Sequence, residues 1–278
     1  MKLRIERKLI DVADYLGSSR DGLFSGTAWH YARYRPGYPQ LFFDEVVRRF
    51  RLDGSERLLD LGCGTGQLIL PLAEHVVEAV GIDPEPEMLA EAARKAQADG
   101  ITNVTWAQGS SSDLPGDFGH FRLVTMGRSF HWMDRERILN TLDDMVDERG
   151  GVVIANDSCL VRPATTWQQA IYEFQYRFLP PDWQASSPNL TSDHEPHQEI
   201  LARSAFGHVQ YQTYEFARTW TIEQAIGYFY STSLPLRRLL GYRRSEFEKA
   251  ITDVLLAIDP EGRFTEPVTL EVLTATKR

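Results

Sequence analysis

Three glycines, Gly62, Gly64 and Gly66, stand at alternate positions directly after the short apolar run 57–61. Glycine lets a backbone turn tightly and approach a ligand, and amides exposed where a helix begins favour polar or anionic ligand atoms. Asp83 follows twenty-one residues after Gly62, beyond a second apolar run, where a carboxylate can accept hydrogen bonds from a ribose diol. The spacing therefore predicts a nucleoside-binding crevice at the carboxyl ends of two adjacent parallel strands.

Asp60 distinguishes the ligand classes that such a turn can serve. It lies two residues before Gly62, where its carboxylate would repel a pyrophosphate but would suit a cationic amino group. The glycines follow a G-x-G-x-G pattern, whereas dinucleotide sites usually have G-x-G-x-x-G. Both features count against an oxidoreductase that uses NAD(P).

The residues around the turn resemble a known family. The run Asp-Leu-Gly-Cys-Gly-Thr-Gly at 60–66, with Asp83, is similar to the binding motif of class I S-adenosylmethionine-dependent methyltransferases. The stretches 31–39, 81–89 and 129–132 resemble its small-molecule subgroup with a UbiE-like or trans-aconitate-methyltransferase-like core. The resemblance implies S-adenosyl-L-methionine as cofactor and S-adenosyl-L-homocysteine as product.

The resemblance also implies roles for individual residues. Gly62 and Gly64 would face the methionine part of the cofactor, and Asp60 would lie near its ammonium group. Asp83 would bind both ribose hydroxyls. The other implied cofactor-binding residues are, in chain order, Tyr31, Arg35, Pro84, Met88, Ser111, Ser112, Gly127 and Arg128.

These further residues would touch different parts of the cofactor. Pro84 and Met88 would pack on the adenine, beside the serine pair at 111–112, which replaces the Ala-Glu pair common in the subgroup. Main-chain carbonyls of residues 127–128 would receive the ammonium group. Arg35, in the N-terminal cover, could hold the cofactor carboxylate.

His131 is the candidate general base, since it follows the fourth predicted strand and imidazole titrates near neutral pH. The alternative is a structural role, in which His131 and Trp132 cap the next helix. The aromatic helix expected over 166–179 could either line an acceptor pocket or pack as core. The candidate acceptor-side residues are Trp132, Trp167, Phe174 and Phe178. No metal site is expected, because His194 and His197 lie in a polar, proline-flanked loop.

The elements that must position these residues alternate along the middle of the chain. Strands are expected over 57–61, 76–82, 103–108, 121–126 and 151–155, and helices over 65–74, 86–98 and 134–145. This alternation predicts βαβ units and a parallel sheet covered on both faces. Outside this region, helices are expected over 39–50, 166–179 and 246–258, strands over 209–217 and 268–274, and an irregular surface segment over 29–39.

The expected fold class is α/β: a Rossmann-like, mostly parallel seven-stranded sheet with helices on both faces, an antiparallel terminal strand and a helical lid insertion. Residues 1–50 would form an N-terminal helical cover. The S-adenosylmethionine-binding core would comprise 51–156 and 206–278, and the acceptor-side lid 157–205, extending to about 240.

Composition limits the cellular setting and the partners. The 278 residues are 42% hydrophobic and 25% charged, with a net charge of −9 and only two cysteines. An ordinary globular composition without a secretory signal, a membrane span or a disulfide framework predicts a cytoplasmic protein. The acidic balance predicts neither a nucleic-acid nor a membrane partner.

The function that these observations favour is methyl transfer from the sulfonium of S-adenosylmethionine to a small-molecule acceptor by in-line displacement, mainly through positioning. The acceptor atom, whether oxygen, nitrogen or carbon, stays open. The alternatives are an NAD(P)-dependent oxidoreductase and a non-catalytic regulatory protein that binds S-adenosylmethionine.

Overall fold

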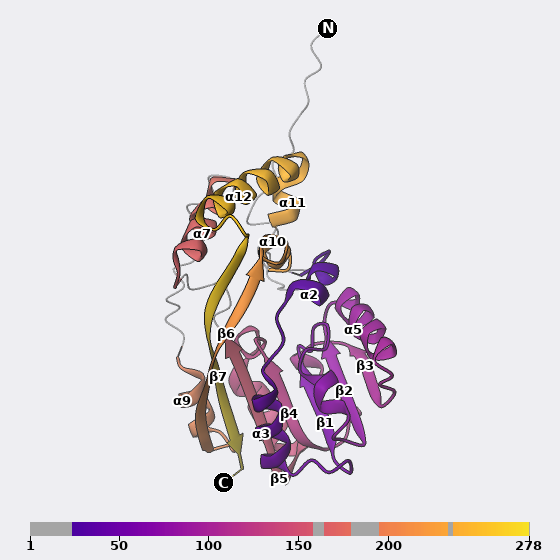
Figure 1. Ribbon diagram of the computed structural model, residues 1–278. Helices are drawn as coiled ribbons and strands as arrows, with labels where there is room; N and C mark the ends of the chain where they lie inside the picture. The colour runs from indigo at the N-terminus through magenta and orange to yellow at the C-terminus, as the bar shows by residue number, and fades with distance from the viewer. Residues whose placement is uncertain (1–23, 158–163, 179–194, 233–235, 278) are drawn as a thin grey trace.

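A seven-stranded sheet forms the centre of the computed structural model, which describes residues 24–157, 164–178, 195–232 and 236–277 (Figure 1). The strand order is β3-β2-β1-β4-β5-β7-β6. The first five strands are parallel to one another, whereas β7 pairs antiparallel with both β5 and β6. The strands are β1 (Arg57–Leu61), β2 (Glu78–Asp83), β3 (Val104–Gln108), β4 (Phe121–Gly127), β5 (Val146–Asp157), β6 (His208–Thr221) and β7 (Arg263–Thr276). The expected fold class is confirmed.

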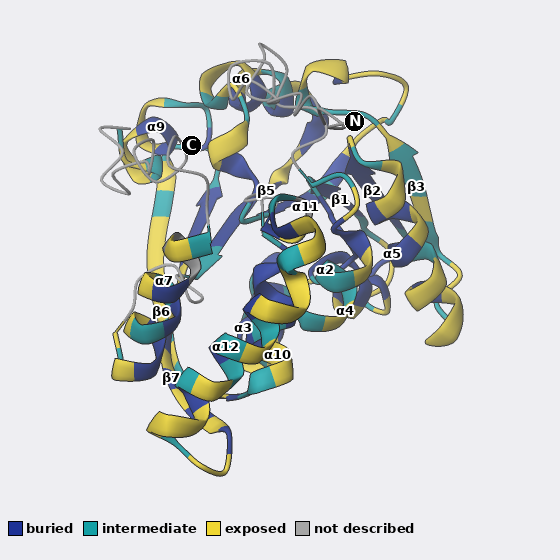
Figure 2. Cartoon of the chain, turned by 90° about the horizontal axis from the view of Figure 1, so that it is seen from above, coloured by how far each residue is buried: buried dark blue, intermediate teal, exposed yellow. Residues whose placement is uncertain are grey.

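Helices cover both faces of this sheet. One buried cluster packs α6 (Arg135–Met145) and α9 (His197–Arg203) on one face. A second cluster packs α3 (Gln40–Phe50) and α4 (Ile69–Ala73), with the end of α5 (Pro86–Ala98), on the other face. In Figure 2 the buried segments gather on the central strands, while the outward side of α5 is exposed. None of the described helices is long and apolar enough to cross a membrane.

A third buried cluster forms a lid beyond the end of the sheet (Figure 1). Its helices are α7 (Thr166–Phe178), α10 (Ile222–Phe229), α11 (Leu236–Leu240) and α12 (Arg244–Ile258). The long strands β6 and β7 carry these helices, because Trp220 and Phe264 near their ends belong to the same cluster. The lid cluster thus includes residues of α12 and β7, beyond residue 240.

Several expected elements have other bounds in the structure, and β5 and β7 both extend beyond the expected 151–155 and 268–274. Prolines and glycines explain two further differences. The segment expected to be irregular over 29–39 contains helix α2 (Ala28–Tyr34), because its helix-breaking residues are confined to positions 36–39. The helix expected over 65–74 is the shorter α4, which begins at Ile69, since Gly66 has a φ of +90° that an α-helix cannot include. The short 3₁₀ helices are η1 (Ser111–Asp113), η2 (Phe130–Trp132) and η3 (Gly241–Arg243).

Candidate functional site

The glycine turn joins the carboxyl ends of β1 and β2. The amides of Gly62 and Cys63 both donate to the carbonyl of Ile82, over 2.8 and 3.0 Å. Gly62 has a φ of +69°, and a Cβ there would lie 2.5 Å from the Cβ of Ser129. Only glycine fits this position, so backbone rather than side chains lines this part of the site.

Asp83 is the last residue of β2 and is 7% exposed. Its Oδ2 accepts the amide of Gly64 over 2.8 Å, and its Oδ1 accepts the amide of Glu85 over 2.9 Å. Burial raises the pKa of this carboxyl, although the two amides oppose the shift. Each carboxylate oxygen has a second lone pair, so the group can accept two more hydrogen bonds from a ligand.

Asp60, on β1, is 1% exposed. Its Oδ1 accepts the hydroxyl of Thr125 over 2.8 Å. Burial raises its pKa to about 7, with a further contribution from the charge of Asp83. A cationic ligand group beside Asp60 would favour the ionised form.

Two adjoining hollows meet over the glycine turn. The main pocket holds Asp83 and contains ten of the residues proposed from the sequence, namely Tyr31, Gly62, Gly64, Asp83, Pro84, Met88, Ser111, Gly127, Arg128 and Trp132. The small pocket holds Asp60 and shares Tyr31, Gly62, Gly127 and Arg128 with the main pocket. The turn thus separates a carboxylate suited to a diol from a carboxylate suited to a cation.

Several residues of the main pocket were missed from the sequence. Phe24, Ser110, Ser129 and Met133 all line it. Ser129 follows β4, and its hydroxyl donates to the carbonyl of Leu61 over 2.6 Å, which ties the ends of β4 and β1 together. Ser129 lies in the stretch 129–132 that resembles the methyltransferase subgroup, and this signal could have identified it.

The structure places Arg35 differently from its expected role beside the cofactor carboxylate. Arg35 lines neither pocket. Its guanidinium donates to the hydroxyl and carbonyl oxygens of Ser231 over 3.0 and 3.1 Å, and to the hydroxyl of Tyr228 over 3.4 Å. It also stacks on the ring of Tyr31. Arg35 therefore joins the N-terminal cover to the lid.

Two other proposed residues lie beside the main pocket rather than in its lining. Ser112 lies in η1, where its hydroxyl is 2.6 Å from that of Ser110. His131 is exposed on η2, with its ring 4.7 Å from that of Trp132. Neither position supplies direct support for the expected adenine contact or general base.

The aromatic residues of α7 belong to the core of the lid. Trp167 is buried, stacks with Phe264 and donates from its Nε1 to the carbonyl of Thr265 over 3.0 Å. Phe174 and Phe178 pack against one another within the same cluster, with 5.2 Å between their ring centroids. All three lie outside the linings of both pockets, which favours plain packing over the acceptor wall. Among the residues that the structure describes, no group of three or more His, Cys, Asp and Glu side chains could hold a metal ion.

The two pockets fit the parts of S-adenosylmethionine. The spare acceptor capacity of Asp83 matches a ribose diol, and the apolar side chains of Ile82 and Met88 match a purine. Asp60 matches an ammonium group, and the bare backbone at Gly62 admits close approach. A nucleoside joined to a charged amino acid therefore suits this pair of hollows, at the carboxyl ends of parallel strands where open α/β sheets bind ligands.

Comparison with known proteins finds similarity to methyltransferases. Residues 58–150 match a methyltransferase domain family. An uncharacterized methyltransferase of Mycobacterium bovis is 31% identical over 42% of this chain and 44% of its own length. A demethylmenaquinone methyltransferase of Geobacillus kaustophilus is 29% identical over 50% of this chain and 59% of its own length. The chain therefore spans about half the length of these curated relatives.

A solved structure supports the same fold. An S-adenosylmethionine-dependent methyltransferase from Geobacter sulfurreducens, in complex with S-adenosyl-L-homocysteine, is similar with a TM-score of 0.53 and 18% identity, over 92% of this chain and 98% of that one. At 18% identity this likeness shows the fold, and the matched methyltransferase domain spans residues 58–150 of the chain. The demethylmenaquinone methyltransferase agrees with the UbiE-like subgroup that the motifs indicated.

Proposed function

We propose that this protein transfers the methyl group of S-adenosylmethionine to a small, partly apolar molecule. The observation that carries this proposal is Asp83, a buried carboxylate in the lining of the main pocket. Each of its two oxygens accepts one backbone amide and keeps a second lone pair for a ligand. S-adenosylmethionine, when bound, supplies a methyl group that is already activated for transfer.

The chain's own residues would hold and orient the reactants. Asp83 would bind the ribose hydroxyls, Asp60 would favour the ammonium group, and the backbone of Gly62 and Gly64 would lie along the methionine part. Methyl transfer that relies on positioning needs no dedicated base unless the acceptor loses a proton as it attacks. His131 stays a proposal for that step only.

The lining of the main pocket favours an apolar acceptor. Phe24 lies edge-on to Tyr31 and to Trp132, at 6.1 and 6.4 Å between ring centroids, and Met133 lines the same pocket. These side chains would exclude water and pack on a ring-containing molecule. One relative is named a demethylmenaquinone methyltransferase, and an acceptor with a similar apolar ring would suit this lining.

Calorimetric titration with S-adenosylhomocysteine tests the cofactor half of the proposal. We expect saturable binding, and its absence at millimolar concentration would defeat the proposal. NADH serves as the comparison ligand, since binding of NADH in place of S-adenosylhomocysteine would favour an oxidoreductase.

A transfer assay tests the acceptor half. Labelled methyl from S-adenosylmethionine should appear in small organic molecules from a panel of ring-containing hydroxyl, amine and activated carbon acceptors. Label that enters only RNA would contradict a small-molecule acceptor. Cofactor binding without transfer to any acceptor would favour the regulatory alternative.

A further inference from the structure

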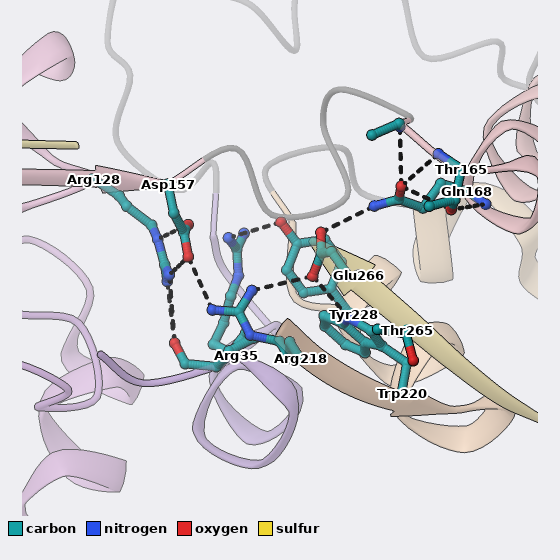
Figure 3. A network of polar contacts seen from close by, with 12 residues as sticks. Arg35, Arg128, Asp157, Thr165, Gln168, Arg218, Trp220, Tyr228, Thr265 and Glu266 are labelled. Atoms are coloured by element: carbon teal, nitrogen blue, oxygen red, sulfur yellow. Dashed lines mark hydrogen bonds and ion pairs between the residues drawn. The ribbon is translucent and has the colours of Figure 1, made fainter. Parts of the chain in front are cut away.

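A buried chain of side chains with alternating charge runs from the main pocket to the lid (Figure 3). Asp157, at the end of β5, accepts two hydrogen bonds from Arg128, over 2.8 and 2.7 Å. The same carboxylate accepts one from Arg218 of β6 over 3.1 Å, and Arg218 in turn donates to Glu266 of β7 over 3.2 Å. The side chains of Asp157 and Glu266 are 1% and 3% exposed, and those of Arg128 and Arg218 are 12% and 11% exposed.

The pocket end of this hydrogen-bond network is Arg128, a residue that lines both pockets. Its φ of +55° lies in the left-handed region, which a residue with a side chain holds only when its surroundings impose it. Asp157 binds the guanidinium, which also stacks on the ring of Tyr38 and donates to the carbonyl of Pro36. Burial disfavours the charge on Asp157, but Arg128 and Arg218 outweigh this effect and hold its pKa below the ordinary value.

The lid end of this hydrogen-bond network is Glu266. It accepts the indole N–H of Trp220 over 2.8 Å and the amide group of Gln168 over 3.1 Å. The Oε1 of Gln168 accepts the backbone amides of Ala164 and Thr165, both over 3.0 Å, where α7 begins. Glu266 therefore fixes the start of α7 against β7, as Figure 3 shows from Arg128 on one side to Thr165 on the other.

Arg218 is the link between these two ends. It lies outside both pockets, yet it bonds with the carboxylate that restrains Arg128 and with the carboxylate that restrains α7. Two largely buried arginines and two buried carboxylates balance in charge, so removal of one member leaves an excess charge in the network. The lid and the pocket backbone therefore share one set of hydrogen bonds.

We propose that Arg218 is a positioning residue for the methyl-transfer site: through Asp157 it holds the Arg128 backbone against the cofactor, and through Glu266 it couples cofactor binding to the lid. This inference rests on the proposed function. Hydrogen exchange with and without S-adenosylhomocysteine reads this coupling directly, because it reports protection of α7, which touches neither pocket.

The test uses the full-length double variant Arg218→Met with Glu266→Gln, which removes one positive and one negative charge together. In the unaltered protein, S-adenosylhomocysteine should slow exchange both at residues 62–66 and in α7. In the double variant at saturating ligand, protection of 62–66 should persist, while the ligand-induced protection of α7 should fall about tenfold and the Kd should rise about tenfold.

A matched control is Arg57→Met with Glu78→Gln, which removes a 2.7 Å ion pair. This pair joins the amino ends of β1 and β2, at the edge of the sheet away from the glycine turn. The control should keep the ligand-induced protection of α7. Unaltered protection of α7 in the Arg218 double variant would overturn the inference, as would an equal loss in the control. Failure of the unaltered protein to bind S-adenosylhomocysteine would instead defeat the proposed function, and this inference with it.

Discussion

Replacing Asp83 by Asn changes one oxygen of the carboxylate to an amide group while keeping the shape of the side chain. The buried carboxylate accepts one backbone amide on each oxygen, from Gly64 and Glu85. The Asn side chain has a single oxygen acceptor, so one ribose hydroxyl would lose its partner. A hydrogen bond to a charged group contributes about 1.5–3 kcal/mol, so the Kd for S-adenosylhomocysteine should rise about 10- to 150-fold.

The same substitution should also weaken the ligand-free fold. The new amide group must face one of the two backbone amides, and a buried donor without an acceptor costs about 1–3 kcal/mol in the free energy of unfolding. Calorimetry gives the Kd, and denaturant unfolding gives the stability change. Asp53→Asn is the control, since it makes the same charge change at an exposed turn where Asp53 accepts the amide of Ser55. Binding by the Asp83 variant within threefold of the unaltered protein would refute the assignment of the ribose to this carboxylate.

Three other predictions follow from burial and close contact. Asp60 has a pKa of about 7 against 3.8 for a free side chain, so its contribution to the free energy of unfolding is full below pH 3.8 and falls as pH rises to about 7. A cationic ligand group should therefore release a proton just below pH 7, detected by calorimetry in buffers of different ionisation enthalpy, and Asp60→Asn should remove this release. Gly62→Ala should lower the free energy of unfolding by about 1–3 kcal/mol and abolish S-adenosylhomocysteine binding, because the added methyl would lie 2.5 Å from the Cβ of Ser129. Binding close to that of the unaltered protein would contradict the tight turn. Gly227→Ala would place a methyl 2.3 Å from the Tyr34 ring and should lower the Tm by about 4 °C or more, whereas Gly37→Ala, which meets nothing within 4 Å, should leave it unchanged.

Local patterns predicted the central elements well. The strand expected over 57–61 has these same bounds in the structure, because its three leucines are buried in the parallel sheet and glycines follow directly. The helix expected over 86–98 is also confirmed, since Pro86 favours its first turn and apolar residues recur on one face. The segment 29–39 was predicted wrongly, because the effect of the helix-breaking residues at its end was assumed for the whole segment. Helix α2 occupies the part before them.

Side-chain roles that depend on contacts between distant parts of the sequence were harder to predict. The glycine turn and Asp83 could be recognised because Asp83 follows Gly62 by twenty-one residues, a spacing that the fold itself sets. Arg35, by contrast, bonds with Ser231, 196 residues away, and no local pattern records such a partner. The aromatic helix α7 has the same composition whether it lines a pocket or packs as core, so the sequence could not distinguish the two, whereas its packing against Phe264 favours core.

The pairing of β6 with β7 continues from His208 and Thr276, beside the parallel strands, to Thr221 and Arg263 at the lid. The described residues between these last two, 222–232 and 236–262, contribute no strand to the sheet. Divergence in this segment, by insertion, deletion or exchange with a related gene, can therefore reshape the lid without disturbing any of the hydrogen-bonded strand pairs. One sheet can in this way carry lids of different shape beside the same pocket during evolution.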